Sequence, residues 1–286
     1  MSRYLDPTND VSFRKLFGTE EHKPLLISFL NSTLGLESDR KIKQVELLPK
    51  DQAPLIKETK TSILDVKCTD ERNIQYIVEM QNKKVPGFVK RTQFYVAHSY
   101  VTQLPSGSEY FELKPVVFLV LANHNLFPNK EKAISYHKTL DVETMEHDLE
   151  DLSYVFIELP KFTKKEAELK SVKDKWLYFF KNWHDTNEVP SNVEEKELIE
   201  AYRSMEEYNW NQEERDAYIK SNIALTDEFD ARRKEREEGL KQGLEKGAKS
   251  KSLEIARTMM LENLPIEQIA KFTGLSTEEI SALEKK

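Results

Sequence analysis

The sequence predicts an α/β protein, with a mixed sheet flanked by helices and a helical C-terminal extension. Strand-like and amphipathic helical segments alternate up to about residue 185, and beyond it the pattern is helical and highly charged. With 33% charged and 38% hydrophobic residues among 286, the chain can form one large domain and an appendage. We expect a domain over residues 1–185, a helical connection over 186–237 and a C-terminal segment over 238–286.

The predicted domain begins with two helices. Asn9 or Asp10 can cap a short helix that runs to Gly18, and a second helix is expected to end at Gly35. Three strands follow, because apolar and polar residues alternate there. They span residues 43–49, 61–69 and 74–81.

The second half of the predicted domain returns to helices and strands. An amphipathic helix fits residues 88–104, and the apolar run 115–124 predicts a strand buried on both faces. Residues 134–140 and 153–159 are expected to add edge strands. A helical pattern then begins at Lys164, and its aromatic residues are spaced to pack back on the core. These are Trp176, Phe179, Phe180 and Trp183.

Three glycines stand four residues apart in the C-terminal segment, at Gly239, Gly243 and Gly247. Each glycine costs a helix about 1 kcal/mol. They therefore either permit close helix contact or loosen a hinge. We favour contact, and predict a homo-oligomer formed through the C-terminal helices.

The last residues predict two short helices separated at Gly274, with Ser276 and Glu279 forming a capping box. This pattern is similar to a helix-turn-helix hairpin. A DNA-reading second helix presents donors at its N-terminal end, where Glu278 and Glu279 stand here. We therefore favour a folded cap or an oligomerisation element over a sequence-specific DNA reader.

Charge is unevenly distributed along the chain. The net charge of −7 argues against a nucleic-acid partner, but residues 1–120 carry 17 Lys and Arg against 15 Asp and Glu. The first half can therefore accept an anionic substrate. No apolar run approaches the roughly 18 to 20 residues that span a bilayer, and the start lacks a signal peptide. With a lone Cys68, the sequence predicts a soluble, cytoplasmic protein with no membrane partner and no structural metal.

Polar side chains are concentrated on one face of two predicted strands. Alternation places Asp65 with Lys67, and Glu79 with Gln81. If these strands pair as a matched antiparallel hairpin, the two carboxylates stand side by side. Such a pair suits magnesium, which polarises phosphate and activates water. The alternative is the ordinary solvated face of an antiparallel sheet.

The segment LDVKCTDERNIQYIVEMQ resembles the core of the PD-(D/E)XK nuclease superfamily, whose acid and E-x-K motif lie on adjacent strands. Its E-x-Q ending resembles one branch, the recombination-promoting nuclease and putative transposase family of bacteria. The resemblance implies a restriction-endonuclease-like fold and a DNA endonuclease that uses Mg²⁺ or another divalent cation. The resemblance extends to residues 9–18 before this segment. After it, the resemblance extends to residues 91–104, 112–121, 157–162 and 269–283.

The resemblance also implies roles for individual residues. Asp65 and Glu79 correspond to metal ligands, the Met80 carbonyl to a possible third ligand, and Gln81 to the position that usually holds lysine. A neutral amide can orient water or phosphate but cannot supply positive charge. Lys67 could supply that charge from the neighbouring strand; otherwise it is a surface lysine.

Asp10 resembles the acid that the superfamily often contributes from its first helix, and it may equally be an N-cap. Four cations follow the E-x-Q motif, at Lys83, Lys84, Lys90 and Arg91. Each alone is typical of a solvated surface. As a cluster at a helix start, they predict contact with the DNA backbone.

Two other functions remain compatible with these patterns. One is a non-catalytic DNA-binding protein that retains the nuclease fold. The other is an oligomeric assembly protein built through the C-terminal helices.

Overall fold

The computed structural model describes residues 3–49, 51–52, 62–104 and 107–283. The chain divides into two compact units, Met1–Asn222 and Ile223–Lys286. The first unit includes helix α5 (Lys196–Met205), which lies within the segment 186–237 that the sequence predicts to be a connection.

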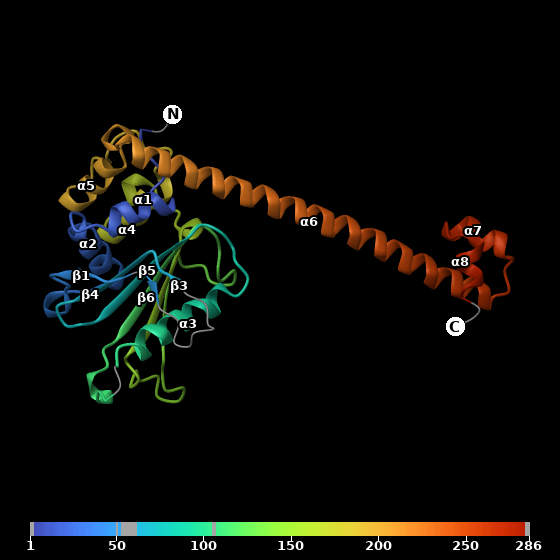
Figure 1. The fold of residues 1–286 in the computed structure, drawn as a ribbon, viewed down its shortest axis with the longest axis horizontal. Coiled ribbons are helices and arrows are strands. Elements are labelled where there is room, and N and C mark those ends of the chain that lie inside the picture. The colour runs from blue at the N-terminus through green and yellow to red at the C-terminus, as the bar shows by residue number, and fades with distance from the viewer. Residues whose placement is uncertain (1–2, 50, 53–61, 105–106, 284–286) are drawn as a thin grey trace. The chain divides into compact units, whose positions relative to one another are not determined.

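A six-stranded mixed sheet forms the centre of the first unit (Figure 1). The β4–β5 and β7–β8 pairs are antiparallel, while β5–β6 and β6–β8 are parallel. The predicted α/β class with a mixed sheet is therefore confirmed. In spatial order the strands are β1 (Val45–Leu47), β4 (Val66–Asp70), β5 (Gln75–Gln81), β6 (Val116–Ala122), β8 (Leu152–Glu158) and β7 (Ile134–Lys138).

Two strand predictions were wrong in detail. The strand predicted over residues 61–69 is interrupted by a bend at Asp65, so that β3 (Ser62–Ile63) pairs separately with β2 (Asp51–Gln52). Thr61 lies outside the described residues. The segment predicted as a second edge strand is β8, which lies inside the sheet between β6 and β7. Sheet order depends on pairing between distant segments, which alternation within one segment does not encode.

Helices cover both faces of the sheet (Figure 1). The face that carries the larger core is covered by α1 (Asp10–Phe17), α2 (Lys23–Leu34), α4 (Val172–Asn182) and α5. The other face is covered by α3 (Phe88–Val101). Short 3₁₀ helices occur at Ser38–Arg40, Tyr110–Glu112, Leu159–Lys161, Glu166–Glu168 and Glu207–Asn209.

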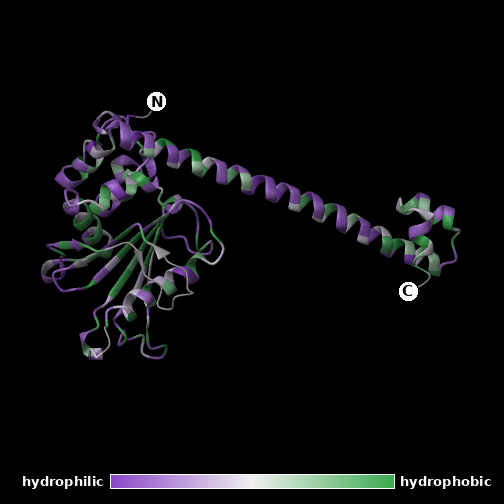
Figure 2. Cartoon of the chain, viewed as in Figure 1, coloured by the Kyte–Doolittle hydropathy of each residue, from purple (hydrophilic) through white to green (hydrophobic). Residues whose placement is uncertain are grey.

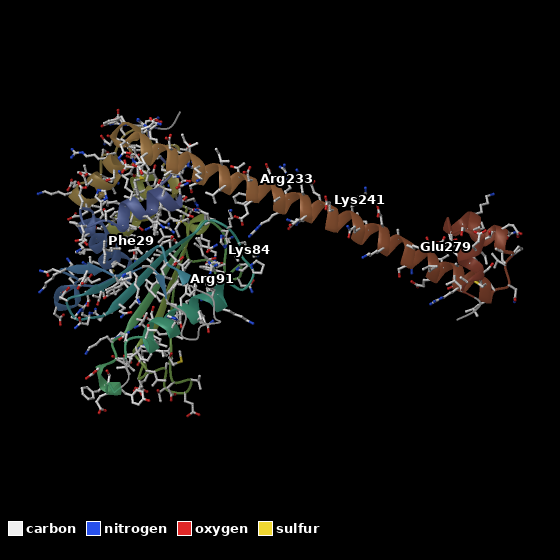
Figure 3. The ribbon with its side chains drawn as sticks, viewed as in Figure 1. Phe29, Lys84, Arg91, Arg233, Lys241 and Glu279 are labelled. Atoms are coloured by element: carbon white, nitrogen blue, oxygen red, sulfur yellow. The ribbon has the colours of Figure 1, made fainter. Side chains whose placement is uncertain are left out.

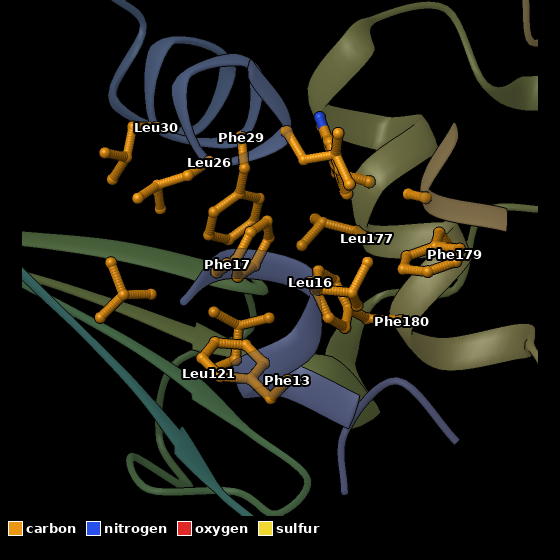
Figure 4. Close-up of a cluster of buried hydrophobic side chains, with 14 of the residues drawn as sticks. Phe13, Leu16, Phe17, Leu26, Phe29, Leu30, Leu121, Leu177, Phe179 and Phe180 are labelled. Atoms are coloured by element: carbon orange, nitrogen blue, oxygen red, sulfur yellow. The ribbon is translucent and has the colours of Figure 1, made fainter. Parts of the chain in front are cut away.

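Aromatic rings fill the larger core (Figure 4). Phe17 of α1 stacks on Phe29 of α2 with ring centroids 5.0 Å apart, and it lies 5.8 Å from Trp176 of α4. The aromatic face predicted for α4 is therefore largely confirmed. Trp183 differs, because it is the C-cap of the helix and only half-buried. This aromatic packing holds α1, the helix that carries Asp10, against the sheet.

The smaller core lies between α3 and the sheet, and includes Ile77, Phe88, Val96 and Phe118. Alternate residues of β6 enter the two cores, which confirms the strand predicted to be buried on both faces. The central strands accordingly appear in green in Figure 2. A strand held on both faces and by two parallel neighbours is a rigid support for side chains at its end.

Helix α6 (Gln212–Leu261) begins in the first unit and continues into the second, with Gly239, Gly243 and Gly247 inside it. A Cβ atom built at any of the three would meet no described atom within 4 Å. Contact within the described chain therefore does not explain these glycines. No helix among the described residues is long and apolar enough to cross a membrane.

The second unit ends in a helical hairpin of α7 (Ile266–Thr273) and α8 (Thr277–Ser281). The break occurs at Gly274, whose φ of 68° lies in the left-handed region that glycine adopts without strain. The capping box is present, because Glu279 N donates to Ser276 Oγ and Ser276 N donates to the Glu279 carboxylate. Ala256 of α6 forms a small core with Ile269 of α7 and Ile280 of α8.

Candidate active site

The structure brings Asp65 and Glu79 together. Val66 of β4 pairs with Val78 of β5, so the next step along the antiparallel ladder sets Asp65 opposite Glu79. Asp65 N donates to Glu79 Oε1 at 3.3 Å, and Met80 N donates to Asp65 Oδ2 at 3.0 Å. Both acids are buried. The antiparallel register that the sequence analysis required is therefore present.

Burial and the neighbouring acid make Glu79 costly to ionise. Burial is the largest cause that raises the pKa of Glu79, and the charge of Asp65 raises it further. The Asp65 amide and the charges of Arg91 and Arg14 act in the opposite direction. A cation bound between the two acids would offset the repulsion that raises this pKa.

Asp10 is not the N-cap of α1. Asn9 takes that role, because its side chain accepts a hydrogen bond from Val11 N at 2.8 Å. Asp10 is half-buried at the first position of the helix, and its pKa is raised by burial and then by the charge of Asp65. The N-cap alternative was therefore wrong for Asp10, whose carboxylate interacts electrostatically with Asp65.

Two arginines neutralise part of this charge. Arg14 Nη2 donates to Asp65 Oδ1 at 3.1 Å, and Arg91 Nη2 donates to Gln81 Oε1 at 3.1 Å. Sequence reasoning missed Arg14 in this position. The signal was present, since Asp10 and Arg14 stand four residues apart and share a helix face.

Gln81 is held in place at both ends of its amide. Its Nε2 donates to Lys83 O at 2.6 Å, while its Oε1 accepts from Arg91. Arg91 in turn lies over the rings of Phe88 and Tyr95, with centroid distances of 5.0 and 5.7 Å. Arg91 is therefore half-buried and lines the site, whereas the sequence analysis expected a solvated cation in contact with the DNA backbone.

Lys67 lies on β4 opposite Ile77, two residues from Asp65. Burial lowers the pKa of its ammonium group, and no described carboxylate opposes that shift. The contribution of Lys67 to the site therefore stays a prediction. Met80 packs its side chain into the larger core, so only its backbone can take part.

The remaining predicted cations stand just before α3 or in its first turn, and Figure 3 labels Lys84 and Arg91 among them. Lys83 is half-buried and its charge lowers the pKa of Asp10, which places it beside the site. Lys84 and Lys90 are exposed. Arg91 approaches the carboxylates from the same helix end.

A polar network connects the strand ends to the segment before α1. Asn123 Nδ2 donates to Thr8 Oγ1 at 2.9 Å and to Asn82 Oδ1 at 2.6 Å. Asn82 Nδ2 donates to Thr8 O at 2.6 Å. Sequence reasoning missed these residues, because amides outside any motif give no pattern. They fix Asp10 and Arg14 relative to the sheet.

The donor set fits a magnesium-type cation with few protein ligands. Two carboxylates and a nearby backbone carbonyl, completed by water and phosphate, are a common magnesium arrangement. Within the described residues, no group of three or more His, Cys, Asp or Glu side chains has a metal-binding arrangement. If a metal binds, Asp65 and Glu79 are therefore its natural protein ligands.

Two hollows of about 780 and 400 Å³ lie elsewhere. The first is lined by α2 and the starts of α4 and α5, and the second by Tyr76, Tyr136 and Arg72. Neither includes Asp65 or Glu79. The candidate site lies where β4 begins and β5 ends, apart from both hollows.

Comparison with protein families agrees with this geometry. Residues 7–235 match the model of the PD-(D/E)XK nuclease family transposase. The chain belongs to this family. Residues 249–285 match the model of the Rpn/YhgA-like nuclease family, C-terminal HTH domain. Comparisons with curated proteins and with solved structures gave no significant match.

Family membership confirms the resemblance found in the sequence and supports a nuclease and DNA-binding class of function. It also identifies the α7–α8 hairpin as part of a helix-turn-helix segment. The roles of the individual site residues stay predictions.

Replacing Glu79 with glutamine should stabilise the metal-free protein, and the gain should grow with pH. Burial and Asp65 raise the pKa of Glu79 to about 8. The folded wild type therefore holds this proton more tightly than the unfolded chain does, and it loses stability as pH rises from the ordinary carboxylate pKa to about 8. Glutamine stays neutral throughout. Thermal unfolding in EDTA at pH 6 and pH 9 should show a larger gain at pH 9, of roughly several degrees.

Glu46→Gln on β1 is the matched control, because Glu46 is exposed. Its effect should be small and equal at both pH values. A Glu79→Gln variant that is less stable than the wild type at pH 9 would contradict the prediction.

Proposed function

We propose that this protein is a metal-dependent DNA endonuclease that hydrolyses phosphodiester bonds. The observation that carries the proposal is the contact between Asp65 and Glu79 at the ends of adjacent strands. Family membership supports the nuclease class. We further propose that DNA cleavage promotes recombination in a bacterial cytoplasm, as the family resemblance implies.

The proposed reaction is an in-line hydrolysis. Water oxygen forms a bond to phosphorus, the bond from phosphorus to one ester oxygen breaks, and the products carry a phosphate monoester and a hydroxyl group. A divalent cation held at the site would polarise the phosphate and activate the water. Asp65, Glu79 and the Met80 carbonyl would hold it.

The other site residues have supporting roles in this proposal. Gln81, fixed by Arg91, would orient water or a phosphate oxygen through its amide. Asp10 would adjust the charge around Asp65, because burial and then the charge of Asp65 raise the pKa of Asp10. Lys67 could add positive charge from β4.

DNA would approach along the start of α3. Lys83, Lys84 and Lys90 would contact phosphates, and Arg91 would line the site behind them. This arrangement offers an anionic polymer a basic approach although the whole chain is acidic.

The C-terminal unit would serve mainly in self-association. Glu279 at the start of α8 forms an ion pair with Lys249 of α6 at 2.6 Å, so this helix start presents an acid rather than a donor. The HTH family match supports DNA contact as the second possibility.

The alternative function is a non-catalytic DNA-binding or oligomeric assembly protein that retains the nuclease fold. Gln81 in place of the usual lysine favours it, because the motif then lacks its cation. Salt-sensitive DNA binding without cleavage would select the DNA-binding protein, and no DNA binding would select the assembly protein.

Asp65→Ala should reduce magnesium-dependent nicking of plasmid DNA about 100-fold or more. Loss of a residue that only hydrogen-bonds to a metal ligand typically costs about 10 to 100-fold, and Asp65 is itself a proposed ligand. Glu79→Ala should do the same. Asp39→Ala is the control, since Asp39 is exposed in the short helix Ser38–Arg40. Nicking that persists in EDTA, or full activity of Asp65→Ala, would reject the metal-dependent mechanism.

Neutralising both Lys83 and Lys84 should weaken DNA binding equally for unrelated sequences. Because each phosphate contact contributes about 0.9 to the salt slope, the slope of log K against log salt should fall by about 2. Titrations at several salt concentrations measure this. A Lys41→Ala, Lys43→Ala double variant removes two exposed charges elsewhere and should bind normally. Equal losses in both variants would place the DNA elsewhere.

Charged substitutions on α6 should dissociate the proposed oligomer. Leu240 and Leu244 are 65% and 66% exposed and stand one helical turn apart beside the glycines. Leu240→Glu with Leu244→Glu should lower the mass measured by light scattering without unfolding the core. Lys241→Glu on the same helix (Figure 3) is the control. A wild-type protein that is already monomeric would refute self-association.

A further inference from the structure

The E-x-Q motif has a neutral glutamine where the superfamily usually has lysine, so the motif itself supplies no positive charge. Both ends of the Gln81 amide already have partners, Lys83 O and Arg91. Arg91 is held between that amide and two aromatic rings. Lys67 of β4 pairs with Ile77 of β5, two positions before Glu79. Gln81 is neutral, and among the described residues neither Arg91 nor Lys67 makes a hydrogen bond to Asp65 or Glu79.

Arg14 occupies a different position. Its side chain is 43% exposed, whereas that of Asp65, which it contacts, is only 10% exposed. The guanidinium group therefore lies at the mouth of the site, between the buried carboxylate and solvent. Besides its contact with Asp65, its charge opposes the raised pKa values of Asp10 and Glu79.

Arg14 uses little of its bonding capacity. Within the described residues, its side chain makes one hydrogen bond, from Nη2 to Asp65 Oδ1. A guanidinium group has five donors in a planar fork that matches phosphate oxygens. The other carboxylate oxygen, Oδ2, accepts from Met80 N. Oδ1 is thus the atom of Asp65 for which Arg14 and a divalent cation would compete.

We infer that Arg14 is a catalytic residue of the proposed nuclease, one that leaves Asp65 when metal and DNA bind and contacts the reacting phosphate in place of the missing motif lysine. This inference rests on the proposed function. Arg14 stands on α1, which the aromatic core holds against the sheet, so only its side chain has to move. The motion exchanges one carboxylate contact for a phosphate contact and keeps the guanidinium group charged throughout.

The inference separates metal binding from catalysis. If Arg14 competes with the metal, Arg14→Ala should bind Mn²⁺ or Ca²⁺ alone as tightly as the wild type or more tightly. If Arg14 contacts phosphate, the same variant should lower the salt slope of DNA binding in Ca²⁺ by about 1. Its magnesium-dependent cleavage should fall about 100-fold or more, as expected for loss of a group that stabilises transition-state charge. Arg14→Lys should recover part of that loss.

The experiment measures metal affinity by calorimetry without DNA, DNA affinity in Ca²⁺ at several salt concentrations, and single-turnover cleavage in Mg²⁺. Arg40→Ala is the matched control, because Arg40 is an exposed arginine in the short helix Ser38–Arg40, away from the carboxylates. It should match the wild type in all three measurements.

The result that would overturn the inference is a loss of metal affinity in Arg14→Ala, because Arg14 would then only position Asp65. An unchanged salt slope or wild-type cleavage in that variant would overturn it as well. If the wild type itself cleaves no DNA with any divalent cation, the proposed function fails. The metal affinity and the salt slope still decide whether Arg14 competes for Asp65 and contacts phosphate.

Discussion

Repulsion between two buried carboxylates is the constraint on which the rest of the site depends. Asp65 and Glu79 face each other across an antiparallel pair, and burial weakens the solvation that would make their charges tolerable. The fold answers with the Met80 amide, Arg14 and Arg91. These partners offset part of the repulsion between the two acids, and the raised pKa of Glu79 shows that part of it remains.

The architecture keeps this costly pair in place. Strand β5 is held on both sides, by antiparallel β4 and parallel β6, and both faces of the sheet are packed by helices. The cap residue Asn9 also bonds to Ser221 and Asn222, so the start of α1 is tied to the start of α6. The stability supplied by the two cores thus offsets the cost of burying two carboxylates beside each other, a balance typical of functional sites.

Several errors of the sequence analysis share one cause. Alternation within a segment gave the right faces for Glu79 and Gln81, since β5 is regular. It missed the bend at Asp65 that separates β3 from β4, and it placed β8 at the edge of the sheet. In both cases the outcome depends on which other strand pairs with the segment, and that information is spread over distant parts of the chain.

By itself, the sequence determined the fold class and the family, because alternation and motif spacing are local properties. The register that sets Asp65 against Glu79 was a condition in the sequence analysis, and the structure supplied it. Only the tertiary structure decided which cations approach the carboxylates. Arg14 arrives from a helix 51 positions away in the chain, and Arg91 is drawn from the surface into the site wall by Gln81 and two rings. Charge acts through space, so its partners are chosen by packing between elements rather than by order along the chain.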